Sequence, residues 1–240
     1  MNILITGGAS GLGEAITRKL AVNQDDKIFF TFKSSANNAD ILQDELPNVK
    51  GIQCNFGDSE DMNRLLSFID NADLDVLINN AFTTDLAPKH FHKTKASVFL
   101  DNFNANILPV ILITQQCITG FRKKKFGKII NILSSAVVGN PPVGWAEYTA
   151  AKAYFASLSK SWATEYAASN ITSNSVSPSF MQTRLTSNTD DRVIEEIMEH
   201  HPFKQLLTTN EVSDTVLFLS KCSQQINGTN IIMNAGTNVI

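Results

Sequence analysis

The sequence predicts an α/β protein in which helices cover both faces of one parallel β-sheet. Short apolar runs alternate with helical patterns along the whole chain, and polar residues close several of these runs. A glycine-rich turn directly follows the first run. The length of 240 residues and a hydrophobic content of 43% suit one soluble globular domain. We therefore expect a single domain that spans residues 1–240, with a doubly wound, seven-stranded parallel sheet.

The predicted strands are continuous runs of Ile, Val, Leu and Phe. A parallel sheet between two helical layers is buried on both faces, so its strands need not alternate apolar and polar residues. The runs that fit are 2–6, 27–33, 49–54, 74–78, 128–133, 171–176 and 231–233.

Helical patterns fill most of the intervals between these runs. They cover a stretch with Leu12, Ile16 and Leu20 spaced by four, then 37–46, a helix capped by Asp58, 96–121, 148–168 and 212–219. Pro109 should kink or break the helix over 96–121. We expect 83–95 to form a loop over the site and 184–202 to form a mobile segment that covers the substrate.

The glycine turn after the first strand has the pattern of a dinucleotide-binding loop. Gly7 allows a sharp turn, Gly11 lets the backbone approach a pyrophosphate, and Gly13 allows close packing of helix on strand. The N-terminus of the following helix would supply N–H groups and the positive end of its dipole to the phosphates. A glycine turn can also be purely structural, and its place between strand and helix favours the functional interpretation.

Tyr148 and Lys152 are the candidate catalytic pair. Residues four apart share one face of a helix, so the phenol and the ammonium can serve one small volume. A cation at that distance should lower the pKa of the phenol towards the range of proton transfer near neutral pH. The motif alone is weak because it also arises by chance, and it gains weight from the other stretches.

The tip of the second strand indicates which cofactor is preferred. An acidic residue near this position would bind the ribose 2′-hydroxyl of NAD, whereas here Lys33 is followed by Ser34. A cation beside hydroxyls suits the 2′-phosphate of NADP(H), with NAD(H) still possible. The alternative is that Lys33 is an ordinary exposed lysine at a strand end.

Together these stretches resemble the short-chain dehydrogenase/reductase family, in its single-domain Rossmann form. The turn from Thr6 to Gly13 is similar to the family's cofactor loop, and Asn79-Asn80-Ala81 to its Asn-Asn-Ala-Gly strand end. Tyr148 and Lys152 match its catalytic pair. Ser135 lies thirteen residues before Tyr148, the family's usual interval, and is chosen over Ser134 for that reason.

The resemblance implies a set of site residues. The catalytic residues would be Asn106, Ser135, Tyr148 and Lys152. The cofactor-binding residues would be Gly7, Ala9, Ser10, Gly11, Leu12, Gly13, Lys33, Ser34, Asn55, Phe56, Asn80, Ala81, Tyr148, Lys152, Pro178 and Thr183. The substrate pocket would include Phe82, Val137, Trp145 and Met181. In these roles Tyr148 donates a proton to a carbonyl, Lys152 also binds the nicotinamide ribose, and Asn106 holds a water that links Lys152 to solvent.

Some positions depart from the family pattern. Phe82 stands where the family has glycine, Asn55 where it usually has aspartate, and Ser179 where glycine follows proline. Asn234-Ala235-Gly236 replaces Asp-Gly-Gly. None of these changes removes a catalytic group, so they bear on pocket shape and cofactor affinity.

The implied function is an NADPH-dependent reductase of a small or apolar ketone or a 3-oxoacyl-type substrate. The alternatives are a catalytically silent nucleotide-sensing or scaffold protein on the same fold and a sugar-nucleotide epimerase or dehydratase. The net charge of −3 argues against nucleic-acid binding, and neither the three cysteines nor the histidines have metal-ligand spacing. We expect a cytoplasmic protein with no leader and no membrane span, paired as a homodimer or homotetramer through helices 96–121 and 148–168.

Overall fold

The computed structural model describes residues 1–83, 88–183, 186 and 189–237. Seven strands form one sheet in the order β3-β2-β1-β4-β5-β6-β7, and every pair of neighbours is parallel. The predicted fold class is confirmed, with strand ends within about two residues of the sequence pattern. The strands are β1 (Asn2–Ile5), β2 (Lys27–Phe32), β3 (Val49–Gln53), β4 (Val76–Asn79), β5 (Gly127–Ile132), β6 (Ile171–Pro178) and β7 (Asn230–Met233).

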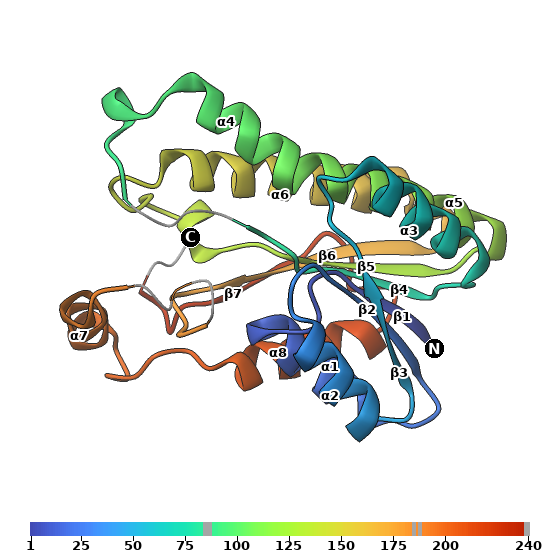
Figure 1. Ribbon diagram of the computed structural model, residues 1–240. Coiled ribbons are helices and arrows are strands. Elements are labelled where there is room, and N and C mark those ends of the chain that lie inside the picture. The colour runs from blue at the N-terminus through green and yellow to red at the C-terminus, as the bar shows by residue number, and fades with distance from the viewer. Residues whose placement is uncertain (84–87, 184–185, 187–188, 238–240) are drawn as a thin grey trace.

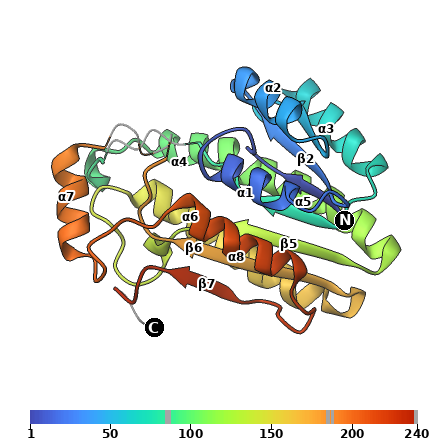
Figure 2. The ribbon, with the colours of Figure 1, turned by 90° about the horizontal axis from the view of Figure 1, so that it is seen from below.

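Helices lie on both faces of this sheet (Figures 1 and 2). One face carries α1 (Gly11–Ala21), α2 (Ala36–Glu45) and α8 (Thr209–Lys221). The other carries α3 (Ser59–Asn71), α4 (Ala96–Asn102), α5 (Leu108–Lys124) and α6 (Ala146–Glu165). Asp58 caps α3 as predicted, since its carboxylate accepts the backbone N–H groups of Glu60 and Asp61. A capping box of Thr208 and Glu211 starts α8.

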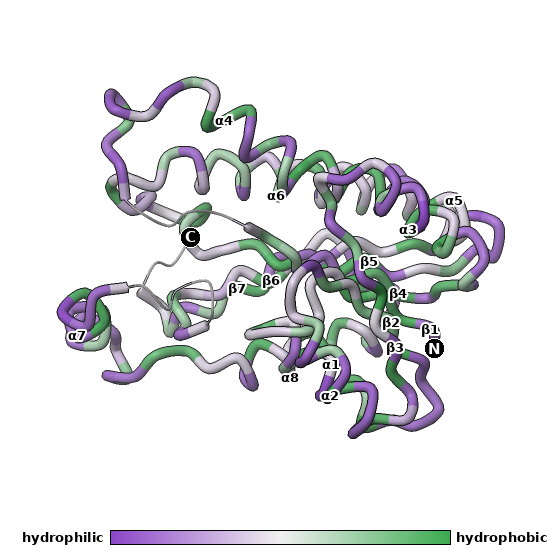
Figure 3. Tube along the Cα trace, in the orientation of Figure 1, coloured by the Kyte–Doolittle hydropathy of each residue, from purple (hydrophilic) through white to green (hydrophobic). Residues whose placement is uncertain are grey.

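Each face of the sheet has its own hydrophobic core. Ile3, Ile5 and Ile78 point towards α1 and α8, whereas Leu4, Leu77 and Ile129 point towards α3, α5 and α6. This alternation follows from the strand geometry, in which successive side chains point to opposite faces. Figure 3 shows the apolar residues concentrated along the central strands between the two helical layers.

The helical stretch over 96–124 is continuous but not uniform. A π-helical turn, η2 (Phe103–Ile107), joins α4 to α5, and Pro109 occupies the first turn of α5. The expected break is therefore a change of helical pitch just before the proline. By length and composition alone the stretch Ala96–Lys124 could cross a membrane, a test that core helices of soluble proteins also pass. In the structure it is a layer helix that contacts α3 and α6, and 28% of its most apolar part is buried.

The structure contains a helix that the sequence analysis did not predict. Residues 184–202 were expected to be a mobile segment, and the structure has a helix, α7 (Asp191–His200), within that range. Residues 184, 185, 187 and 188 lie outside the described residues. Asp190 caps this helix, and none of its residues is buried. In Figure 1 it stands apart from both helical layers.

Candidate active site

The predicted site residues meet at one edge of the sheet because all seven strands are parallel. Carboxyl ends of parallel strands lie at the same edge, where ligands of such folds bind. Gly7 follows β1, Asn80 follows β4, and Ser134 follows β5. The sequence separates these residues widely, and the register between β1, β4 and β5 brings them together.

The glycine turn is closed and braced from neighbouring strands. Gly7 and Gly11 have φ angles of +68° and +55°, which side-chain-bearing residues rarely adopt. A Cβ at Gly13 would lie 1.9 Å from the carbonyl oxygen of Gly7, so only glycine fits there. Asn80 donates its amide hydrogens to the carbonyl oxygens of Thr6 (2.9 Å) and Gly7 (3.2 Å).

This turn fits the pyrophosphate of a dinucleotide. Ser10 is the N-cap of α1 and makes no side-chain cap hydrogen bond to the first turn. First-turn N–H groups at an uncapped helix start are donors suited to an anion. Ala9 and Leu12 are buried and hold the turn onto the core around Ile3. Asn80 therefore braces the glycine turn through the carbonyl oxygens of the turn. Ser10, Gly11 and Leu12 belong to the part of the turn that begins α1.

The adenosine end of the predicted cofactor site lies at the tip of β2. Lys33 and Ser34 are exposed there, and a cavity of about 280 Å³ is lined by Ser34 to Asn38. Asn38 connects it to the glycine turn by donating to the carbonyl oxygen of Ala9 at 3.3 Å. Asn55, predicted to contact adenine, uses its side-chain oxygen to accept the N–H of Gly57. Phe56 packs at the margin of the core below α3.

Lys152 is buried at the start of α6, with 3% of its surface exposed. Its ammonium donates to the carbonyl oxygen of Ile132, at the end of β5, at 2.8 Å. It also lies 4.1 Å from the centre of the Phe82 ring. Burial lowers the pKa of Lys152 to about 7, because the charged form loses water without gaining an anionic partner.

Tyr148 is half-buried one turn before Lys152, and its ring packs edge to face between Phe82 (5.3 Å) and Trp145 (5.5 Å). Burial raises the pKa of the phenol, and a hydrogen bond with Ser134 acts in the opposite direction. The expectation that Lys152 lowers this pKa is wrong for the protein without cofactor. A lysine that loses its proton near pH 7 is no longer a cation where a phenol titrates.

The serine beside Tyr148 is Ser134. Its hydroxyl accepts the N–H of Ala136 at 3.2 Å and is near enough to the phenol to oppose the rise in the Tyr148 pKa. Ser135 instead begins the short helix η3 (Ser135–Val137). The interval counted back from Tyr148 selected Ser135, and the geometry favours Ser134. The reason is that the end of β5 fixes the position of the serine, whereas the length of the connection to α6 does not.

Asn106 lies in the π-helical turn and is 3% exposed. Its amide oxygen accepts the N–H of Thr83, and its amide nitrogen donates to the carbonyl oxygen of Thr83, both at 2.7 Å. The same nitrogen contacts the backbone and side-chain oxygens of Asn102 at 3.2 Å. Protein groups therefore occupy both ends of the amide, and the side chain fixes the segment that follows β4. π-Turns of this kind are frequent at functional sites.

A buried polar network that the sequence reasoning missed anchors α6 to the sheet. Asn79 donates to Thr114 (3.1 Å) and to Asn131 (3.0 Å). Asn131 in turn donates to Ser159 on α6 (2.9 Å) and Ser173 on β6 (3.2 Å). The signal that the sequence offered was a polar residue within each of three strands that are neighbours in the sheet: Asn79 in β4, Asn131 in β5 and Ser173 in β6. These hydrogen bonds favour one arrangement of the elements they join, here the position of the helix that carries Tyr148 and Lys152, although the side-chain oxygen of Asn79 has no hydrogen-bond partner among the described residues.

The remaining predicted residues lie around this centre. Pro178 ends β6, Thr183 hydrogen-bonds through its backbone N–H to Thr186 at 2.8 Å, and Met181 packs against the core near α8. Val137 lies in η3, and Trp145 is the N-cap of α6. Within the described part of the chain, no three His, Cys, Asp or Glu side chains gather as a metal site.

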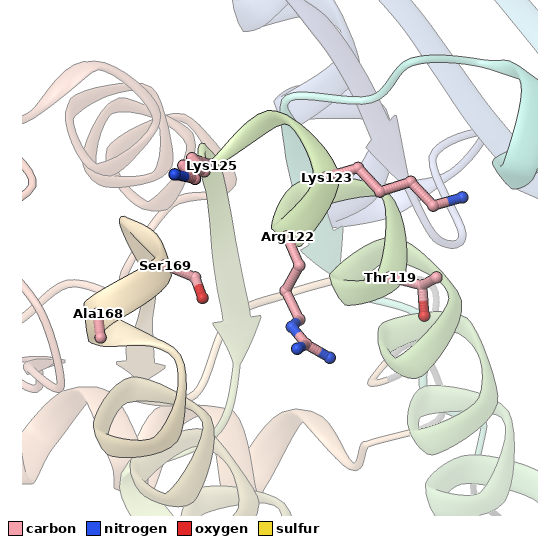
Figure 4. Close-up of a pocket in the computed structure, with 6 residues that line it drawn as sticks. All are labelled: Thr119, Arg122, Lys123, Lys125, Ala168 and Ser169. Carbon is pink, nitrogen blue, oxygen red and sulfur yellow. The ribbon is translucent and has the colours of Figure 1, made fainter.

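A second cavity lies elsewhere. It has a volume of about 430 Å³ and is lined by Thr119, Arg122, Lys123, Lys125, Ala168 and Ser169 (Figure 4). Lys125 precedes β5 and Ser169 precedes β6, so this cavity is at the amino ends of the strands, opposite the catalytic edge. Arg122, Lys123 and Lys124 form the last turn of α5, and Lys124 pairs with Asp73 (3.0 Å) and Asp75 (2.7 Å).

The fold and the site define a dinucleotide-binding enzyme of the Rossmann class, with a tyrosine–lysine pair at its catalytic edge. The family model described as short chain dehydrogenase matches residues 1–193, and the chain belongs to this family of oxidoreductases. It is 30% identical to the 3-oxoacyl-(acyl-carrier-protein) reductase FabG of Aquifex aeolicus, over 97% of this chain and 95% of that one.

Other comparisons agree with this assignment. The FabG protein of Haemophilus influenzae is 32% identical, over 97% of this chain and 96% of that protein. A short chain dehydrogenase/reductase family structure from Burkholderia thailandensis has a TM-score of 0.86 at 26% identity and covers 98% of this chain and 91% of its own. A putative gluconate dehydrogenase from Agrobacterium tumefaciens, at 22% identity and a TM-score of 0.90, shares the fold over 100% of this chain and 96% of its own.

Proposed function

We propose that this chain is an NADPH-dependent reductase of 3-oxoacyl thioesters. The observation that carries the proposal is the position of Tyr148 one helical turn before the buried Lys152, whose side chain is held at the end of β5 by the carbonyl oxygen of Ile132. The names of the two FabG relatives support the substrate class. Lys33 and Ser34, exposed at the tip of β2 beside the cavity of about 280 Å³, support the preference for NADPH.

In the reducing direction Tyr148 gives its phenolic proton to the carbonyl oxygen. Ser134 donates a hydrogen bond to the same oxygen and stabilises the charge that develops on it. The amino group of Lys152 would hold the nicotinamide ribose. Once protonated, it would also favour loss of the Tyr148 proton. The bound nicotinamide supplies the hydride. The protein contributes proton transfer and positioning, which are typically worth about 10²–10⁴-fold for a general acid.

Asn106 has a positioning role in this proposal. Because its amide is paired with Thr83 and Asn102, it acts through the segment after β4 and not as the side-chain ligand of a water. Val137, Trp145, Met181 and Phe82 form the apolar surroundings of the substrate.

Two other functions are weaker. A silent nucleotide sensor on this fold would need neither a buried Lys152 nor a serine hydrogen-bonded to Tyr148. A sugar-nucleotide epimerase or dehydratase usually carries a longer C-terminal domain, whereas this chain spans 95% and 96% of the two reductases.

The decisive experiment compares two serine variants in one assay. NADPH oxidation is followed with an acetoacetyl thioester and with a simple ketone, for the wild type, Ser134→Ala and Ser135→Ala. We expect kcat to fall by about 10²-fold or more for Ser134→Ala, the typical loss of one oxyanion donor, and to change little for Ser135→Ala. The reverse order would assign the role to Ser135. No thioester reduction by the wild type would refute the substrate class.

The domain, assembly and location belong to the same proposal. We propose one domain over 1–240 in a cytoplasmic homodimer or homotetramer. Val98, Leu100, Leu108 and Tyr154, on α4, α5 and α6, are exposed by 37–66%. Apolar side chains gathered on a helical layer mark an interaction surface. A monomeric mass by light scattering at micromolar concentration would refute the assembly.

A further inference from the structure

Phe82 occupies the space directly over the catalytic pair. Its ring centre lies 4.1 Å from the ammonium nitrogen of Lys152, and its edge-to-face contact with Tyr148 has a centroid distance of 5.3 Å. The function proposed above does not require this ring. The family pattern places glycine at the position, and glycine could make neither contact.

The backbone next to the ring is held firmly. Thr83, the following residue, exchanges two hydrogen bonds of 2.7 Å with the buried amide of Asn106. On the other side, the N–H groups of Asn80 and Ala81 both donate to the hydroxyl of Thr6 at 3.0 Å. The backbone on both sides of Phe82 is therefore anchored by hydrogen bonds. The fold thus sets the point from which the ring projects towards Lys152.

The ring limits what Lys152 can bind. Within the described residues, the ammonium has one hydrogen-bond acceptor, the carbonyl oxygen of Ile132, and the π-face of Phe82 covers another side of it. A ribose hydroxyl that accepts from Lys152 needs an uncovered N–H direction. An ammonium has three N–H groups, and with one on Ile132 and one facing the ring only one remains for the two hydroxyls of a ribose.

We propose that Phe82 is an aromatic cover of Lys152, which the ribose hydroxyls of the nicotinamide cofactor displace when they bind. This inference rests on the proposed function for the identity of the cofactor. Phe82 is a positioning residue because it acts through Lys152. The covered arrangement competes with cofactor, so the apparent affinity is reduced by the fraction of molecules in which the ring has moved away.

The first test measures cofactor affinity by quenching of tryptophan fluorescence during NADPH titration. Phe82→Ala should bind NADPH about three- to thirtyfold more tightly than the wild type, the range that corresponds to loss of one cation–π contact. Phe82→Leu keeps apolar bulk without a π-face and should fall between the two. Phe91→Ala is the matched control, since Phe91 is 69% exposed in the same connection between β4 and α4. Unchanged or weaker binding by Phe82→Ala overturns the proposal.

The second test needs no cofactor. Lysines are acylated at pH 10, where even an ordinary lysine is about a quarter neutral. The rate at Lys152 is divided by the rate at Lys160, an exposed lysine on the same helix. Loss of the cover should raise this ratio severalfold in Phe82→Ala and leave it unchanged in Phe91→Ala. An unchanged ratio in Phe82→Ala overturns the proposal. If no variant binds NADPH, the proposed function fails, and the acylation ratio still decides whether Phe82 covers Lys152.

Discussion

The buried ammonium of Lys152 should make the stability of this protein depend on pH. Lysine has an ordinary pKa of 10.5, and burial lowers the pKa of Lys152 to about 7 in the folded chain. Between these two values the unfolded chain binds one proton more than the folded chain. The free energy of unfolding must therefore rise with pH across this window. The stability gained in this way is lost again as the pH falls towards 7.

The size of the effect follows from the gap between the two pKa values. Each pKa unit corresponds to about 1.4 kcal/mol, so the whole window is worth roughly 5 kcal/mol. The accessible part, from about pH 7 to 9.5, should supply about 3 kcal/mol. The side chain is only 3% exposed, so solvent screening takes little from this value. Below pH 7 both states are protonated, and Lys152 adds no further dependence.

The substitution Lys152→Met isolates this contribution, since methionine is similar in length and has no proton to lose. Losing the hydrogen bond to the carbonyl oxygen of Ile132 costs about 1–3 kcal/mol at every pH, which offsets part of the burial penalty that the methionine variant escapes near pH 7. Urea unfolding at fixed protein concentration should show the difference, wild type minus variant, growing by about 3 kcal/mol between pH 7 and 9.5. Lys160→Met, at an exposed site on the same helix, is the control and should give a flat difference. Parallel curves for the wild type and Lys152→Met would refute the reasoning.

Three further predictions concern the cofactor and the chemistry. Tyr148→Phe should lower turnover by about 10²–10⁴-fold and leave NADPH affinity nearly intact, because the ring packing stays while the proton donor is lost; turnover close to wild type would exclude Tyr148 as the acid. The wild type should prefer NADPH over NADH by about ten- to hundredfold, and Lys33→Asp should reverse the order; tighter NADH binding by the wild type would make Lys33 a surface lysine. Gly13→Ala should abolish NADPH binding, because its Cβ would meet the oxygen of Gly7 at 1.9 Å; normal affinity would show that the turn can open.

The strands could be predicted because burial on both faces makes them continuous apolar runs, as in Ile3-Leu4-Ile5. Their parallel arrangement follows from alternation with helices, whereas the order of the strands in the sheet was not predicted. The helix α7 was missed because it buries none of its residues, so no core pattern set it apart from a charged loop. The spacing of apolar residues along a chain therefore predicts buried strands and helices well and exposed helices poorly.

The sequence analysis proposed which residues form the site, and it could not show the contacts that these residues make. Tyr148 and Lys152 follow from helix geometry, and Asn106 from a polar residue in an apolar helix. Ser134 was not chosen because the interval was counted back from Tyr148. That interval depends on the length of the connection between β5 and α6, which varies. That Asn106 pairs with the backbone of Thr83 depends on a π-turn and on a segment more than twenty residues earlier. Such contacts arise only once the sheet has set the register of its strands.

The two pKa directions also constrain the order of events at the site. Burial raises the pKa of Tyr148 and lowers that of Lys152 to about 7, so with protein groups alone Lys152 loses its proton before the phenol can ionise. The pair gains its acid–base function only when something restores the charge of Lys152. Ribose hydroxyls that accept from the ammonium would do so, since hydrogen bonds to a charged form stabilise it. Repeating the Lys152→Met pH series with saturating NADPH tests this step: the pH-dependent part of the difference should shrink, because Lys152 then keeps its proton. A difference that grows with pH as steeply as before would mean that the charge is not restored by the cofactor.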